Sequence, residues 1–277
     1  MLTDIGTSIT YSLIDGRQPH AQRTVTTPLT QSQLTSLERD GYLALPSAID
    51  PERRARLGAA IDQLAERVDA GMVPSHAPGE EFYRDLMLHD ERFVELMTDP
   101  LLVNTARTML GAHVRLRSMT CRDNRPSSAG NRGIGWHIHQ RGASEPRPRW
   151  FSPLQGLDCL HYLDASNADS GPTAVIPGSH RNPQIDLAHD QADHPDQRIL
   201  ELPAGSLLLM HPNLYHRGLP ATGATPRRRL LIVSFVPSWY RWSPHDRHDH
   251  GPWIQTMATR WRDDPEQLEL LGIGGYT

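Results

Sequence analysis

The chain has few of the features that mark secreted, membrane or nucleic-acid-binding proteins. Only two cysteines, Cys121 and Cys159, occur in 277 residues, which excludes a disulfide scaffold and is typical of a reducing cytoplasm. Acidic residues outnumber basic ones, 32 against 28, and the net charge of −4 argues against general nucleic-acid binding. No run approaches the roughly 18 apolar residues that span a bilayer, and no signal peptide is evident. These absences predict a cytoplasmic protein with a small-molecule partner and no membrane or nucleic-acid partner. The oligomeric state is left open, a homo-oligomer included.

The N-terminal half predicts helices that begin at recognisable caps. Residues 1–27 are polar without clear periodicity and are expected to form an arm, either loose or added to a sheet edge. Thr30 and Gln33 have capping-box spacing, and Asp50 and Asp99 each precede a proline at a first helical position. Apolar residues then recur at three- and four-residue intervals, which favours core packing over a binding surface.

The pattern changes after Gly111 to the two-residue period of strands. Val114 and Leu116 alternate with Arg115 and Arg117, and further short apolar runs follow between turns rich in Gly, Pro, Asn and Asp. Many short strands with this punctuation predict a mainly β fold with flanking α-helices, a double-stranded β-helix or cupin-like jelly roll. Residues 28–277 are expected to form this single domain, because no repeat or second domain is evident.

Three histidines form the most informative motif. His137 and His139 are two apart, so on a strand their side chains project from one face, and His216 lies on a later predicted strand. Neutral imidazoles bind Fe, Zn, Cu and Ni, and three ligands on one face of an octahedron leave positions for other groups. The 15 histidines of the chain make such a pair easy to obtain by chance, so its surroundings carry weight.

These surroundings resemble a known family. Four motifs follow the histidine pair in order. The first is the turn Ile176-Pro177-Gly178-Ser179-His180, which Gly171 precedes, and the second is an apolar strand that begins with Pro203-Ala204-Gly205. The last two are His216 and a strand from 228 to 235 that carries arginines. Together with Leu34–Pro46, they are similar to the phytanoyl-CoA dioxygenase (PhyH) family of Fe(II)/2-oxoglutarate-dependent oxygenases. The resemblance covers about residues 28–240. It implies Fe(II) and 2-oxoglutarate as cofactors, dioxygen as oxidant, and oxidation, most simply hydroxylation, of a C–H bond in a small-molecule substrate. A role in secondary metabolism is the favoured setting.

The resemblance also assigns residues. His137 and His216 match two metal ligands of the family, and an arginine after the distal histidine matches the group that binds the far carboxylate of 2-oxoglutarate. Arg228 is preferred for that role over Arg227, because strand alternation puts the two on opposite faces. Gln155 is a further candidate to face the cosubstrate.

His139 departs from the family pattern, which has an acidic residue there. Three outcomes are open: His139 binds the metal, it turns aside and leaves a position for water, halide or Glu145, or the site is inactive or prefers zinc. Two other classes also stay open. One is a cupin-like metal-dependent isomerase, lyase or hydrolase, which would tolerate loss of Arg228; the other is a binding homologue without turnover.

Two further segments invite interpretation. Residues 140–152 contain three arginines, two prolines and one glycine and are expected to form a lid over the substrate. Residues 245–250 resemble a second metal cluster in composition, but an exposed turn explains them better. His180 is expected to serve structure within its turn.

Overall fold

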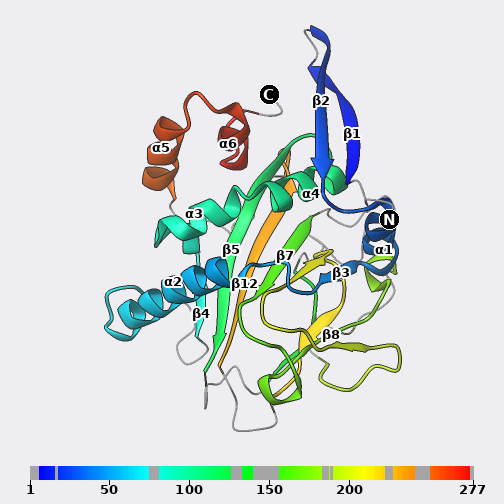
Figure 1. The fold of residues 1–277 in the computed structure, drawn as a ribbon, viewed down its shortest axis with the longest axis vertical. Helices are drawn as coiled ribbons and strands as arrows, with labels where there is room; N and C mark the ends of the chain where they lie inside the picture. Colours follow the sequence, from blue (N-terminus) through cyan, green and yellow to red (C-terminus); the bar gives the residue numbers. More distant parts are fainter. Residues whose placement is uncertain are drawn as a thin grey trace.

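The computed structural model describes residues 6–15, 18–74, 81–125, 133–139, 156–182, 187, 190–221, 227–240 and 250–274. Two antiparallel sheets face each other, and helices cover the outer face of the larger one (Figure 1). The six-stranded sheet has the order β3 (Tyr42–Leu45), β10 (Ser206–Met210), β7 (Leu157–Tyr162), β12 (Arg228–Pro237), β5 (Val114–Asn124), β4 (Phe82–Arg84). The four-stranded sheet has the order β6 (Ile134–His137), β11 (His216–Gly218), β8 (Thr173–Val175), β9 (Arg198–Leu200). This is the expected jelly roll.

The large sheet is buried on both faces because successive side chains point in opposite directions. On β7, Cys159 packs into the core shared with the helices, whereas Leu160 and Tyr162 pack toward the small sheet. The helices are α1 (Gln31–Asp40), α2 (Pro51–Asp69), α3 (Glu91–Met97), α4 (Pro100–Leu110), α5 (Gly251–Arg260) and α6 (Pro265–Leu270). Because the helices cover only one face of the large sheet, its other face can line a site between the two sheets.

Helix starts follow the sequence signals. The Thr30 side chain accepts from the Gln33 backbone N–H, and Asp50 and Asp99 cap α2 and α4. These three helices confirm the expectation. Helices α3, α5 and α6 had no counterpart among the expected elements. No helix in the described part of the chain is long and apolar enough to cross a bilayer.

The N-terminal residues form a hairpin of their own. Strands β1 (Thr7–Asp15) and β2 (Gln18–Thr27) pair with each other and extend away from the sandwich (Figure 1). The hairpin is fixed to α4 by the Tyr11 hydroxyl, which donates to the Arg107 carbonyl at 2.9 Å. The arm is therefore a separate ribbon and adds no strand to either large sheet.

Candidate metal centre

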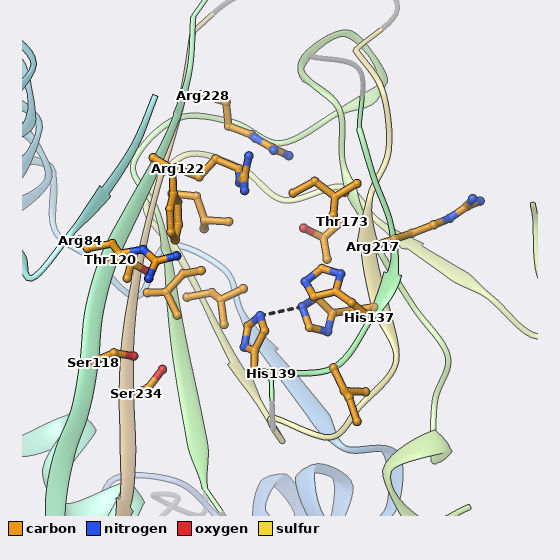
Figure 2. Close-up of a pocket in the computed structure, with 18 of the residues that line it drawn as sticks. Arg84, Ser118, Thr120, Arg122, His137, His139, Thr173, Arg217, Arg228 and Ser234 are labelled. Atoms are coloured by element: carbon orange, nitrogen blue, oxygen red, sulfur yellow. Dashed lines mark hydrogen bonds between the residues drawn. The ribbon is translucent and has the colours of Figure 1, made fainter. Parts of the chain in front are cut away.

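The small sheet brings the three histidines together. His216 on β11 lies directly opposite His137 on β6, and their ring centroids are 4.2 Å apart. His139 follows the end of β6 (Figure 2), and its Nε2 lies 3.1 Å from Nε2 of His216. One nitrogen of each ring lies within 4.8 Å of those of the other two. Two ligands about 2.1 Å from one ion at a right angle would be about 3 Å apart, so this spacing suits a shared metal.

Hydrogen bonds orient all three rings in the same sense. Nδ1 of His137 faces the Gly135 carbonyl and Nδ1 of His216 faces the Leu214 carbonyl, each at 2.9 Å. A carbonyl oxygen only accepts, so Nδ1 carries the proton and Nε2 presents its lone pair. Nδ1 of His139 faces a carboxylate in the same way. Lone pairs facing one another at 3.1 Å repel unless a cation lies between them, which is how these residues fit a metal.

The carboxylate behind His139 belongs to Asp158 on β7. Its Oδ2 accepts from His139 Nδ1 at 2.7 Å, and its Oδ1 accepts from the Ser234 hydroxyl at 2.6 Å. Burial alone would raise the pKa of the Asp158 carboxyl, but His139 and Ser234 outweigh it and the pKa is lowered. Asp158 was not among the candidates from sequence, although an acidic residue inside an apolar strand is a usable signal.

The environment of His216 keeps its ring neutral. Burial first, and then the neighbouring His137 and His139, lower the pKa of His216 well below its ordinary value. A neutral imidazole is the form that donates a lone pair to a metal. Burial therefore prepares this side chain for ligation.

A cavity of about 390 Å³ lies between the sheets and is bordered by the three histidines and by Arg228. Arg228 is 3% exposed; one terminal N–H group donates to the Gly171 carbonyl, and burial lowers the pKa of its guanidinium. Its Nε–H is buried and has no hydrogen-bond partner among the described residues. A buried guanidinium with an unused donor is suited to an anion that enters the cavity.

Arg227, which immediately precedes β12, and Arg229 on β12 do not line the histidine cavity. Arg227 forms two hydrogen bonds of 2.7 Å with Asp123, and Arg229 pairs with Asp164 at 2.8 Å. The expected alternation is therefore observed, and Arg227 is absent from the cavity lining. Among these consecutive arginines, Arg228 alone borders the histidine cavity.

The remaining cavity wall is mixed in character. Apolar side chains of Leu160, Leu230 and Ile232 come from the large sheet. Arg84 and Arg122 lie over the Phe82 ring, 5.4 and 5.2 Å from its centroid, at the β4 edge. Figure 2 shows Arg122 beside Arg228, with the histidines across the cavity. The wall can thus combine water exclusion with contacts to a polar molecule.

Several expected site residues lie outside the described residues. They are Gln155, Glu145, the segment 140–152 and residues 245–249. His250 is buried where α5 begins. His180 donates through Nε2–H to the Glu38 carbonyl at 3.1 Å, and its ring centroid lies 4.9 Å from that of His211. This hydrogen bond to the end of α1 agrees with the structural role expected for His180.

A roll of two antiparallel sheets with clustered imidazoles at an internal cavity is the architecture of metal-dependent jelly-roll enzymes. The phytanoyl-CoA dioxygenase (PhyH) family model matches residues 37–229. The chain belongs to this family and is a dioxygenase.

Curated relatives agree with that membership. The chain is 28% identical over 257 residues to an ectoine dioxygenase of Bordetella parapertussis, covering 79% of this chain and 82% of the relative. It is 26% identical over 229 residues to an L-proline trans-4-hydroxylase of Streptomyces griseoviridis, covering 70% and 82%.

Solved structures share the fold. The crystal structure of HygX from Streptomyces hygroscopicus with nickel and 2-oxoglutarate bound is 19% identical, with a TM-score of 0.60 over 76% of this chain and 88% of HygX. The epimerase SnoN from nogalamycin biosynthesis is 17% identical, with a TM-score of 0.56 over 75% and 83%.

Proposed function

We propose that the protein is an Fe(II)/2-oxoglutarate-dependent dioxygenase in which His137, His139 and His216 hold the iron. The observation that carries the proposal is the convergence of one ring nitrogen from each of three histidines whose rings are each held through Nδ1. Iron bound there with 2-oxoglutarate supplies oxidation of an unactivated C–H bond by dioxygen. Of the three outcomes open at His139, ligation is the one that its contact with Asp158 supports.

Arg228 is the proposed partner of the distal carboxylate of 2-oxoglutarate. Its guanidinium is buried in the same cavity as the histidines, and its Nε–H is unused among the described residues. A guanidinium pairs two carboxylate oxygens in one plane and stays charged when water is excluded. Arg227 is a poor second choice, because Asp123 already occupies its guanidinium. Gln155 stays a candidate from sequence alone.

The proposed reaction is hydroxylation of a small polar molecule. The relatives named for ectoine and L-proline support a substrate of that size and polarity. The protein's part is to orient the substrate with the mixed wall at Phe82 and to exclude water with Leu160 and Ile232. We place the enzyme in the cytoplasm, since Cys121 and Cys159 are buried and unpaired.

The test measures cosubstrate binding and turnover together. Wild-type protein should bind 2-oxoglutarate only with Fe(II) or Co(II) present and should form succinate from it under air. Arg228→Gln should raise the dissociation constant for 2-oxoglutarate about 10- to 100-fold, because a charged hydrogen-bond pair is lost.

The neighbouring Arg227→Gln is the matched control and should keep wild-type cosubstrate affinity. Metal binding should be the same in both variants, which separates the cosubstrate role from the metal site. Equal 2-oxoglutarate affinity in wild type and Arg228→Gln would refute the assignment of Arg228. Metal binding without any succinate would favour a cupin-like non-oxidative enzyme or a binding protein.

A further inference from the structure

We propose that Asp158 is a positioning residue for the metal centre. Its carboxylate holds His139 on the ion and supplies, from behind the ring, negative charge that the three neutral ligands lack. The proposal rests on the proposed function, because it assigns His139 to the metal. It goes further by giving one buried acid on the opposite sheet a part in metal affinity.

The contacts of Asp158 account for its whole carboxylate. One oxygen accepts from Nδ1 of His139 at 2.7 Å and the other from the Ser234 hydroxyl at 2.6 Å. The Asp158 residue is 1% exposed, so water does not compete for either oxygen. A buried carboxylate needs partners of this kind, and here the principal one is a proposed metal ligand.

His139 differs from the other two histidines in what holds it. The rings of His137 and His216 are fixed by backbone carbonyls two residues earlier in the chain. His139 lies beyond β6 and receives its ring partner from β7 in the other sheet. His139, which lies outside the strand, is therefore held by a charged carboxylate, whereas the other two rings are held by neutral carbonyls.

Charge gives that acceptor a chemical role. A divalent ion held by three neutral imidazoles keeps its full double charge within the ligand set. A carboxylate hydrogen-bonded to Nδ1–H makes Nε2 a stronger donor and fixes the ring orientation, and loss of such partners typically weakens metal affinity 10- to 100-fold. Asp158 can thus replace part of what an acidic ligand at position 139 would provide directly.

The variant Asp158→Asn separates charge from shape. The amide oxygen can still accept from His139 while the amide nitrogen donates to Ser234, so the ring keeps a partner and loses the negative charge. Co(II) titration of the apo protein, followed by absorbance, should show a dissociation constant raised about tenfold or more. The Co(II) absorption spectrum should also change, because the donor strength of one ligand has changed.

An exchange of groups gives a second, independent test. In His139→Asp, a carboxylate oxygen replaces Nδ1 beside Asp158, so two carboxylates face each other. This variant should therefore bind the metal more weakly than Asp158→Asn does. The double variant His139→Asp/Asp158→Asn removes that repulsion, because the amide can donate to the new carboxylate. It should bind Co(II) at least tenfold more tightly than His139→Asp alone.

Asp123→Asn is the matched control. Asp123 is fully buried and pairs with Arg227 and Arg125, away from the histidines. This variant should lower the melting temperature of the apo protein without changing Co(II) affinity or spectrum. Wild-type Co(II) affinity in Asp158→Asn, or no gain in the double variant, would overturn the role of Asp158. Failure of the wild type itself to bind Co(II) would instead refute the proposed metal site.

Discussion

Nε2 of His139 lies 3.1 Å from Nε2 of His216, although the two residues are 77 positions apart in the chain. Neither ring has to travel to reach a common ion, since each is already held through its Nδ1 atom. A preorganised ligand set loses little conformational entropy on binding. The apo protein is therefore expected to bind a divalent metal without refolding.

Removal of one ring should break the metal site. We expect His139→Ala to lower Co(II) affinity by about 100-fold or more and to abolish succinate formation, because two imidazoles and solvent are a weaker ligand set. Calorimetric Co(II) titration measures the first effect. His194→Ala, which changes a histidine outside the cavity lining, is the control. Unchanged turnover in His139→Ala would exclude an essential ligand role.

Gly41 ends helix α1 in a left-handed backbone conformation that residues with a side chain rarely adopt. Its φ is +81°, and an added Cβ would lie 2.4 Å from Nδ1 of His180 and 2.8 Å from Leu214. Gly71 has a similar φ of +71° but open space around it. Gly71→Ala should lower the free energy of unfolding by about 1 kcal/mol from backbone strain alone. Gly41→Ala should lower it by at least about 1 kcal/mol more, because overpacking adds to the strain. Urea unfolding compares the two variants, and equal losses would contradict the clash.

Acid should destabilise the fold through His161. Burial, followed by the charge of Arg53, lowers the pKa of His161 to about 4, whereas the unfolded chain titrates near the ordinary value. Between these values the unfolded state binds the proton more readily. The free energy of unfolding is therefore unaffected by protonation of His161 above about pH 6.5. It falls as the pH falls from there toward 4, by about 3 kcal/mol in all. His161→Gln should flatten this part of the stability profile in urea titrations from pH 7 to pH 4. Parallel profiles for variant and wild type would contradict the assignment.

Much of the architecture follows from short-range sequence signals. Caps at Thr30, Asp50 and Asp99 mark the helices that cover the large sheet, and apolar runs mark its strands. The small elements are harder: β4 has three residues and α6 has six, too few for a periodic pattern to rise above chance. The N-terminal arm was expected, but its folding into a hairpin was not, because Gln18–Thr27 is largely polar and gives no clear strand period.

The site divides along similar lines. His137 and His139 could be paired from the strand period, and Arg228 could be separated from Arg227 by alternation, because both arguments use neighbours in sequence. The contact between His139 and Asp158 could not be derived in that way. It depends on how far the two sheets approach each other, which only the packed structure fixes.

The proposed centre draws on both halves of the sandwich. The imidazoles come from the small sheet and the segment just after β6, whereas Arg228 and Asp158 come from the large sheet. A dicarboxylic acid bound at one end by the metal and at the other by the Arg228 guanidinium would link the two sheets. Metal and cosubstrate together should therefore protect the strands of both layers from amide exchange, and the metal alone should protect chiefly the smaller one.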